Sequence, residues 1–259
     1  MPYGYHGRML RVDLTTGTLS IDQPALDLYR RYLGGSALNL HYLLKEMPAG
    51  ADPLGPDNML GLSVGVATGL TISGQSRMTA TAKSPLTGAI GDSQCGGFWP
   101  ARLKWAGFDG IIFKGRAAKP CYLLIDNGRA ELRDAAHLWG RETGEVQRLI
   151  CAELEDERAE VLQIAPAGER LVRYAAIINM CNRANGRTGM GAVMGSKRLK
   201  AVVVRGRLKP AISDRKGFEA LVTWGTRALA ASGLTDMGKY GTAGVVSAQH
   251  KMGGLPSYN

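Results

Sequence analysis

Hydrophobic and polar residues alternate in short segments of the chain that are separated by glycine-rich turns. Leu10–Asp22 alternates around Thr15-Thr16-Gly17, and Cys121–Leu132 contains the dipeptide Asn127-Gly128. Both patterns are typical of β-hairpins, because these turn residues favour the backbone angles that a tight turn requires. Further strands are predicted at Met59–Ala67, Met78–Lys83, Val161–Ala165 and Arg173–Asn179.

Apolar residues at helical spacing predict helices between these strands. One helix is predicted at Pro24–Leu33 and ends at two glycines, and the next has Ser36 as its N-cap and reaches Met47. The apolar face of the second helix is predicted to contain Leu40, Leu43 and Leu44. Two later helices are predicted, one capped by Thr143 and one from Ser213 or Asp214 to about Ala231, with loops at Tyr240–Asn259.

The order of elements in Gly96–Gly115 returns in Gly189–Gly206. Each segment has glycines, a short helical stretch, a lysine and an apolar strand, with Lys104 and Lys200 in comparable places. We interpret this order as a diverged internal duplication, in which two similar half-sites face one another. Two ordinary loop–helix–strand units are the alternative interpretation.

The loop before the second of these segments has the residues of an anion site. Arg183 and Arg187 supply permanently charged, bidentate donors, the geometry that phosphate groups prefer. Free N–H groups at the start of the helix predicted at Ala192–Leu199 also favour an anion. Three glycines would let the backbone approach a ligand closely. They are Gly186, Gly189 and Gly191.

The composition indicates a globular chain whose positive charge suits an anionic partner. Of its 259 residues 35 are glycine, and the formal net charge is +10. The basic residues are scattered, without a run of five or more, which favours a solvated surface over nucleic-acid binding. The N-terminus lacks a signal-peptide pattern and no apolar stretch could span a bilayer, so we expect a cytoplasmic protein without membrane attachment.

The cysteines and a short acidic motif are the remaining candidates for chemistry. Cys95, Cys121, Cys151 and Cys181 lie far apart without a CxxC pair, which fits neither a zinc site nor a cluster-binding run. Cys95 lies on a glycine-rich loop, and two interpretations of it are open. It is either a thiolate stabilised by backbone N–H groups or a closely packed residue. The dipeptide Asp92-Ser93 also has two interpretations, a nucleophile with its base or the residues of a turn. The sequence supports binding of a phosphorylated ligand more than turnover.

Seven motifs resemble those of the aldehyde:ferredoxin oxidoreductase family, in that family's order and spacing between residues 4 and about 206. They are GRMLRVDLTTG (Gly7–Gly17), YLGG (Tyr32–Gly35), KSPLTGAI (Lys83–Ile90), LKWAGFDGII (Leu103–Ile112), HLWG (His137–Gly140), PAGERLVRYAAIIN (Pro166–Asn179) and RANGRTGMGAVMGSKRLKAVVVRG (Arg183–Gly206). Two further motifs, KYGTAG (Lys239–Gly244) and GGLPSYN (Gly253–Asn259), resemble the opening of the family's next domain.

The resemblance implies an α+β fold with two pseudo-twofold-related β-sheets and short helices, followed by a C-terminal helical segment. Residues 1–208 would then be the tungstopterin-binding N-terminal domain, and residues 209–259 the truncated start of a helical domain. In this family the first domain carries a tungsten (or molybdenum) bis-pyranopterin cofactor. The duplication agrees with this, since it offers one half-site for each pterin.

Seven residues match the family's cofactor-binding positions: Arg77, Gln94, Gly96, Arg183, Ala184, Gly186 and Arg187. The resemblance implies that Arg77 contacts one pterin phosphate, that Gly96 lies against a pterin, and that residues 183–187 form the second phosphate loop. Backbone carbonyls of Gln94 and Ala184 would bind the Mg²⁺ that bridges the phosphates. Three features depart from the family pattern, which leaves the substrate and subfamily open. They are the rewritten loop Thr71–Ser76, Cys95 in place of serine and Asn185 in place of alanine.

The implied reaction is oxidation of an aldehyde to a carboxylate, with electrons passing through a [4Fe-4S] cluster to ferredoxin or another electron-transfer protein. A homodimer is compatible with the resemblance. The cluster ligands and acid–base residues belong to later domains in the family, so we expect this chain alone to be incomplete and inactive. Two alternatives are a non-catalytic phosphate- or nucleotide-binding module and a split subunit that needs a separate helical chain.

Overall fold

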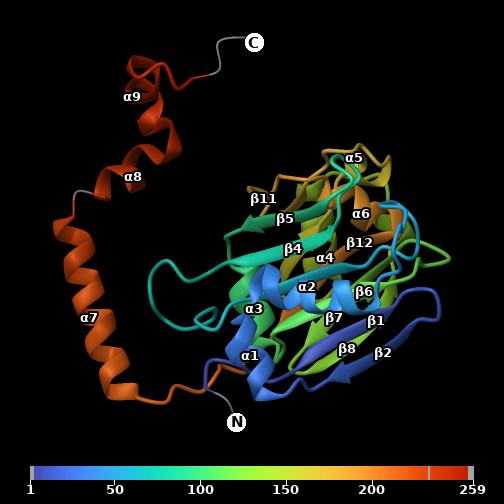
Figure 1. Ribbon diagram of the computed structural model, residues 1–259, viewed down its shortest axis with the longest axis horizontal. Helices are drawn as coiled ribbons and strands as arrows, with labels where there is room; N and C mark the ends of the chain where they lie inside the picture. The colour runs from blue at the N-terminus through green and yellow to red at the C-terminus, as the bar shows by residue number, and fades with distance from the viewer. Residues whose placement is uncertain (1–2, 233, 256–259) are drawn as a thin grey trace. The chain divides into compact units, whose positions relative to one another are not determined.

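Two compact units make up the structure, a computed structural model that describes residues 3–232 and 234–255. The first unit consists of Met1–Leu70 and Gly74–Ala211, and the second of Thr71–Ser73 and Ile212–Asn259. Both β-sheets belong to the first unit (Figure 1).

The first sheet is built from the N-terminal half of the first unit. Its strands are β1 (Met9–Asp13), β2 (Thr18–Asp22), β3 (Leu60–Val64), β4 (Met78–Lys83), β5 (Ile90–Cys95) and β6 (Gly110–Lys114). They lie in the order β2-β1-β6-β3-β4-β5. β1 and β2 form the predicted hairpin, β1 and β6 are parallel, and the other neighbouring pairs are antiparallel.

The second sheet repeats this topology. Its strands are β7 (Cys121–Asp126), β8 (Arg129–Asp134), β9 (Glu160–Gln163), β10 (Ile177–Asn179), β11 (Arg183–Asn185) and β12 (Leu199–Arg205). They lie in the order β11-β10-β9-β12-β7-β8, again with one parallel pair, β7 and β12, beside a hairpin. The two-sheet α+β architecture is therefore confirmed, and the equivalent strand orders are what an internal duplication produces.

Short helices connect and cover the strands. They are α1 (Leu26–Tyr32), α2 (Gly35–Glu46), α3 (Trp99–Trp105), η1 (Ala136–Leu138), α4 (Thr143–Glu153), α5 (Pro166–Glu169) and α6 (Met190–Ser196). The prediction that Ser36 and Thr143 cap helices is wrong, because neither helix start has a side-chain cap. Gly34 is the N-cap of α2, since its φ of 107° and its contact with the Val64 carbonyl suit only glycine.

One apolar core is shared by the two sheets, and two smaller cores lie under the helices. Ile111 of β6 and Val202 of β12 belong to the shared core, where the indole Nε1 of Trp99 donates to the Val202 carbonyl at 2.8 Å. The next residue of each strand faces the opposite way. Ile112 packs beneath α1 and α2, and Val203 packs beneath α4. Both strands are thus buried on two faces, which explains their continuous apolar sequence.

The buried face of α2 differs in part from the predicted apolar face. Leu43 is buried, but Leu44 is 73% exposed, so it does not share the buried face. The buried face consists of Leu38, Asn39, Tyr42 and Leu43. Asn39 is tolerated there because its amide donates to the Gly61 and Thr79 carbonyls, each at 3.2 Å.

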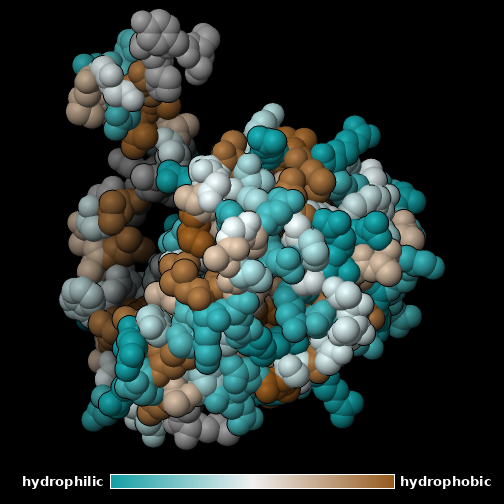
Figure 2. Space-filling model, turned by 45° about the vertical axis from the view of Figure 1, so that its right-hand side comes forward, coloured by the Kyte–Doolittle hydropathy of each residue, from teal (hydrophilic) through white to brown (hydrophobic). Residues whose placement is uncertain are grey.

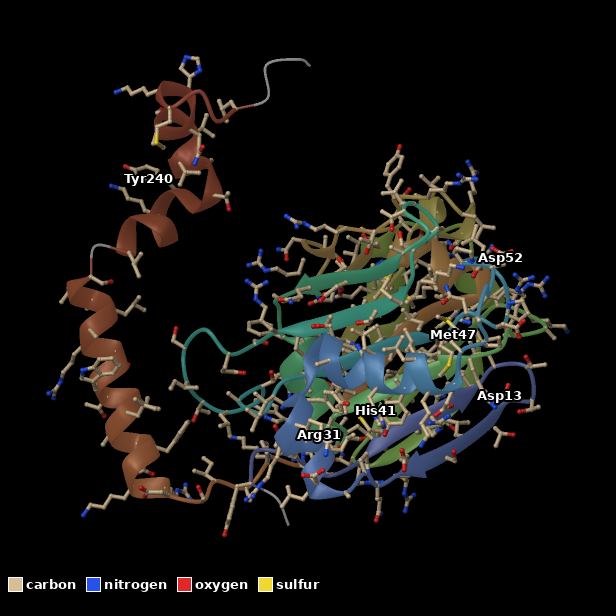
Figure 3. All side chains as sticks on the ribbon, in the orientation of Figure 1. Asp13, Arg31, His41, Met47, Asp52 and Tyr240 are labelled. Carbon is tan, nitrogen blue, oxygen red and sulfur yellow. The ribbon has the colours of Figure 1, made fainter. Side chains whose placement is uncertain are left out.

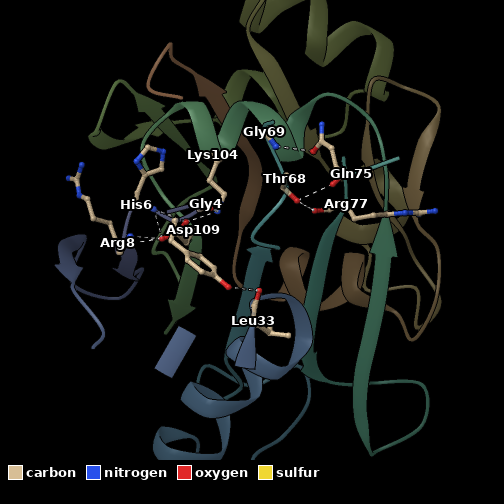
Figure 4. Close-up of polar contacts among 12 residues, drawn as sticks. Gly4, His6, Arg8, Leu33, Thr68, Gly69, Gln75, Arg77, Lys104 and Asp109 are labelled. Carbon is tan, nitrogen blue, oxygen red and sulfur yellow. Dashed lines mark hydrogen bonds and ion pairs between the residues drawn. The ribbon is translucent and has the colours of Figure 1, made fainter. Parts of the chain in front are cut away.

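Two buried lysines show where the duplication has diverged. Lys104 lies in α3 and pairs with Asp109 at 2.7 Å, whereas Lys200 lies in β12 and pairs with Glu169 of α5. The prediction that the two lysines occupy comparable places is therefore wrong. Asp109 also accepts the backbone N–H of Gly7 at 2.8 Å, so the Lys104 pair ties the N-terminal segment to the first sheet (Figure 4).

The second unit is helical over most of its described length. Its elements are α7 (Arg215–Ala231), α8 (Thr235–Tyr240), η2 (Gly241–Val245) and α9 (Val246–Lys251). The loops predicted after Tyr240 are therefore wrong up to Lys251, and residues 256–259 lie outside the described residues. No residue of α7 is buried, and its apolar side chains Leu221 and Leu229 are exposed. Within the described residues, no helix combines the length and hydropathy needed to cross a membrane.

Candidate functional site

The loop that precedes Arg77 is held by a small network of hydrogen bonds (Figure 4). The hydroxyl of Thr68 donates to the carbonyls of Gln75 and Arg77, at 3.1 Å and 3.3 Å. The Gln75 amide in turn accepts the Gly69 N–H at 2.9 Å and donates to the Leu70 carbonyl at 2.8 Å. These bonds fix the backbone of Arg77 and leave its guanidinium free of that network.

β5 is the edge strand of the first sheet, and its residues alternate strictly between exposed and buried. Asp92 and Gln94 are exposed, whereas Ser93 and Cys95 are buried. The turn predicted at Asp92-Ser93 is wrong, because both residues pair with β4 in a regular antiparallel ladder. The alternation presents Gln94 to solvent and turns Ser93 and Cys95 inward.

β11 is the edge strand of the second sheet, and it lies beside β5 (Figure 1). Side chains join the two edges. The Asn185 amide donates to the Ser93 carbonyl at 2.6 Å, and the Arg187 N–H donates to the Ser93 hydroxyl at 3.1 Å. At the end of β5, the Asn179 amide donates to the Gly96 carbonyl at 3.1 Å. We call residues 93–97 and 179–187 the edge junction.

The three arginines predicted to bind phosphate are exposed at or beside the edge junction. Arg77 precedes Met78, which pairs with Cys95 at the end of β5, while Arg183 and Arg187 lie at and just after β11. Within residues 3–232 and 234–255, none of the three guanidinium groups forms an ion pair. Their charge is therefore available to an anion.

Two predicted glycines at the edge junction leave open space that the fold itself does not need. A Cβ at Gly96 would have Ser76 O, at 3.4 Å, as its nearest neighbour, and one at Gly186 would have only the Ala184 Cβ, at 4.0 Å. Neither glycine has a positive φ. Packing and backbone conformation thus do not require glycine here, whereas the close approach of a flat ligand would.

The neighbouring Gly97 has a structural reason to be glycine. Its φ is 104°, and a Cβ there would overlap the Oδ1 atom of Asn179. The lack of a side chain at Gly97 therefore leaves room for Asn179 against the turn after β5. The side chain of Ser76 donates to the Gly97 carbonyl.

The start of α6 does not provide the anion site that the sequence predicted. Gly189 has a φ of 73°, and a Cβ there would overlap the Arg173 carbonyl. At Gly191 a Cβ would lie 2.8 Å from the Ala175 carbonyl, which also accepts the Gly191 N–H at 2.9 Å. These two glycines allow close packing within the protein. Of the three glycines predicted to approach a ligand in this loop, Gly186, Gly189 and Gly191, only Gly186 faces open space.

Cys95 is a packed thiol and not a reactive one. It is 3% exposed, and burial raises its pKa to about 11 although the nearby Arg77 charge acts in the opposite direction. The predicted alternative of a stabilised thiolate is therefore wrong. Burial likewise raises the pKa of Cys121 to about 11, and among the cysteines only Cys181 is exposed.

Sequence reasoning did not single out Asn179 as a site residue. It is fully buried at the end of β10, and its amide reaches across to the turn after β5. The one available signal was a polar residue that closes an apolar segment. Gln94, Gly96, Arg183, Ala184, Gly186 and Arg187 all lie in the edge junction, and Arg77 lies beside it.

A separate cavity of the first unit lies between β2, α1 and α2. It has a volume of about 680 Å³, and its lining includes Arg31 and His41 (Figure 3). Its charges are mostly paired internally, as in the contacts of Arg11 with Glu46 and of Arg31 with Asp27. On the face drawn in Figure 2, hydrophobic side chains are scattered among hydrophilic ones, so apolar exposure does not mark a site there.

Comparisons with known proteins show the family of the chain. Residues 9–206 match the family described as aldehyde ferredoxin oxidoreductase, N-terminal domain. The chain belongs to this family. The tungsten-containing aldehyde ferredoxin oxidoreductases of Thermococcus kodakarensis and Pyrococcus furiosus are each 40% identical over 259 residues, which is 99% of this chain and 43% of each relative. The chain thus spans less than half the length of these relatives.

Other members of the fold have different names and chemistry. The aliphatic sulfonate oxidoreductase, WOR-like subunit, of Pyrococcus furiosus is 33% identical over 236 residues, covering 85% of this chain and 38% of that protein. The solved active site complex BamBC of benzoyl coenzyme A reductase, bound to 1,5-dienoyl-CoA, matches with a TM-score of 0.86 and 36% identity. The match covers 89% of this chain and 35% of that one. The likeness of this domain alone therefore does not decide a substrate.

Proposed function

We propose that this chain is the cofactor-binding portion of a tungsten (or molybdenum) bis-pyranopterin oxidoreductase. The whole enzyme would oxidise aldehydes to carboxylates and pass electrons through a [4Fe-4S] cluster to ferredoxin or another electron-transfer protein. Residues 1–208 would form the tungstopterin-binding domain, and residues 209–259 the start of a helical domain. The observation that carries the proposal is the edge junction, where loops from two equivalent sheets present exposed arginines.

The residues of the edge junction fit two phosphorylated pterins. Arg77 would hold one phosphate, and Arg183 and Arg187 the other. Charge-assisted hydrogen bonds of this kind contribute roughly 1.5–3 kcal/mol each. Gly96 and Gly186 would admit the ligand because the space above each is open. Backbone carbonyls of Gln94 and Ala184 would take the Mg²⁺ between the phosphates, as hard oxygen ligands that suit this ion.

The cofactor, when bound, would supply the redox chemistry through its metal. The residues of this chain would bind it, orient it and cover one side of it. The proposal assigns no catalytic residue to this chain, and the cluster ligands would come from the rest of the enzyme. The free cysteines suit the reducing cytoplasm, which we propose as the location.

Tungsten and pterin content tests the proposal directly. Protein purified from tungstate-grown cells would be compared with its Arg77→Ala and Arg183→Ala variants, each of which is expected to lose about tenfold in cofactor affinity or more. Arg148→Ala removes an exposed arginine of α4 and serves as the matched control. Equal metal and pterin content in all four proteins would rule out the assignment.

A stand-alone phosphate- or nucleotide-binding module is the second candidate, because unpaired arginines also suit simpler diphosphates. A split subunit with the same cofactor is a third arrangement. Steep salt dependence of binding to random-sequence DNA or to nucleoside diphosphates, in protein without tungsten, would favour the module. Bound pterin that co-purifies with tungsten would exclude it.

A further inference from the structure

We propose that Asn185, Asn179 and Cys95 are positioning residues that fix the spacing between the two phosphate-binding loops. The inference rests on the proposed function, since it concerns how the same edge junction is held in shape. The three side chains connect the end of β5 in the first sheet with β10 and β11 in the second.

The three side chains form one continuous buried hydrogen-bond chain. The Cys95 thiol donates to Asn185 Oδ1 at 3.0 Å and accepts from Asn179 Nδ2 at 3.2 Å. Each asparagine also donates to the backbone of the β5 side, Asn185 to Ser93 and Asn179 to Gly96. Both asparagines are fully buried and Cys95 is 3% exposed, so these bonds face little competition from water.

Cys95 can act as the central member because a thiol can both donate and accept a hydrogen bond. It does both here, donating to Asn185 and accepting from Asn179. A serine could provide the same donor and acceptor, whereas alanine or valine could provide neither. The thiol is thus a hydrogen-bond relay between two asparagines and needs no reactivity of its own.

Asn185 lies inside the loop whose outward residues would hold the cofactor. Its side chain is buried against β5, while Ala184 and Gly186 on either side are exposed. Anchoring one residue inward fixes the direction in which its neighbours point. Since a displacement of about 1 Å weakens a preorganised site, the anchor controls how well Arg183 and Arg187 can reach the same ligand as the β5 side.

Four variants of the chain separate positioning from general stability. Asn185→Ala removes the link to β5, Cys95→Ala removes the relay, and Cys95→Ser restores it. Cys121→Ala is the matched control, because Cys121 is a buried thiol of β7 with its pKa raised in the same way. Calorimetry with magnesium pyrophosphate measures the anion site, hydrogen exchange at the Arg187 N–H measures the loop, and urea unfolding measures stability.

The expected result is a loss of about tenfold in pyrophosphate affinity for Asn185→Ala, which corresponds to about 1.4 kcal/mol. Cys95→Ala is expected to lose a similar amount of pyrophosphate affinity. Hydrogen exchange at the Arg187 backbone N–H should be faster in both variants. Cys95→Ser and Cys121→Ala should keep wild-type affinity and exchange, even where urea unfolding shows lower stability.

Two results would overturn the inference in distinguishable ways. If Arg183→Ala lowers the affinity for pyrophosphate but Asn185→Ala and Cys95→Ala do not, the phosphate site stands and the positioning role is wrong. If the wild-type chain has no affinity for magnesium pyrophosphate, the proposed phosphate site itself fails, and the positioning role fails with it.

Discussion

Lys197 provides a prediction that can be worked out from the structure and tested without any cofactor. Its ammonium group is fully buried and donates to the carbonyls of Asn58 and Gly115, the latter at 3.1 Å. Burial lowers the pKa of Lys197 from 10.5 to about 8, with a smaller contribution from Arg116 and an opposing one from Asp57. The folded state therefore releases this proton at a lower pH than the unfolded state.

The sign of the pH dependence follows from this difference. Between pH 8 and pH 10.5 the unfolded chain binds more protons at Lys197 than the folded chain, so stability rises with pH. Each pKa unit corresponds to about 1.4 kcal/mol, which gives a limit of about 3 kcal/mol and a gain of about 1 kcal/mol between pH 7.5 and pH 9. From about pH 8 upward the raised pKa values of Cys95 and Cys121 act in the opposite direction, because these thiols titrate near pH 9 in the unfolded chain. The informative quantity is therefore the difference in slope between wild type and a Lys197 variant, in which the cysteine contributions cancel.

The assay is urea unfolding followed by tryptophan fluorescence at pH 7.5, 8.3 and 9. Between pH 7.5 and pH 9 the stability of wild type should rise by about 1 kcal/mol relative to that of Lys197→Met, whatever the absolute stability of either protein. Lys119→Met removes an exposed lysine and should keep the wild-type slope. Equal slopes in wild type and Lys197→Met would refute the reasoning.

Further predictions concern the glycines, the second unit and activity. Gly97→Ala should lower the free energy of unfolding by about 2 kcal/mol or more, because it combines a positive φ with an overlap, while Gly186→Ala should leave it unchanged; equal urea midpoints would contradict this. Asp214→Ala should lose the hydrogen bond from the Gly217 N–H and about 1 kcal/mol of α7 stability, seen as reduced helical circular dichroism; an unchanged spectrum and melting curve would argue against the cap. Purified chain 1–259 should not oxidise acetaldehyde with a dye acceptor. Oxidation above a metal-free control would contradict the expectation that this chain alone is inactive.

Local patterns predicted much of the fold, because hairpins and amphipathic helices are determined by neighbouring residues. The Asn127-Gly128 turn and the Asp214 cap are examples. Both turn residues have a positive φ, and the Asp214 side chain accepts a backbone N–H three residues away. The duplicated order of loop, helix and strand also indicated two similar sheets. Helices α8 and α9 were missed because each spans only six residues, which is too short for a helical periodicity to stand out.

The edge junction could not be predicted in detail, because it depends on tertiary contacts between distant segments. Nothing in the sequence near Ser93 shows that its carbonyl accepts from Asn185, 92 residues away. For the same reason Gly189 and Gly191 looked like ligand-binding glycines, although a backbone carbonyl from another segment fills the space beside each. Family resemblance supplied the site residues, whereas the structure shows which of them lie together.

The central claim is that two equivalent half-sites meet at the edge junction and hold one cofactor with two pterins. The most direct measurement is the ratio of pterin to tungsten (or molybdenum) in protein purified with its cofactor, combined with the metal content per chain. The account predicts two pterins for each metal and one metal for each chain. A single pterin for each metal, or two pterins that persist at full occupancy in a chain with both Arg77→Ala and Arg183→Ala, would contradict it.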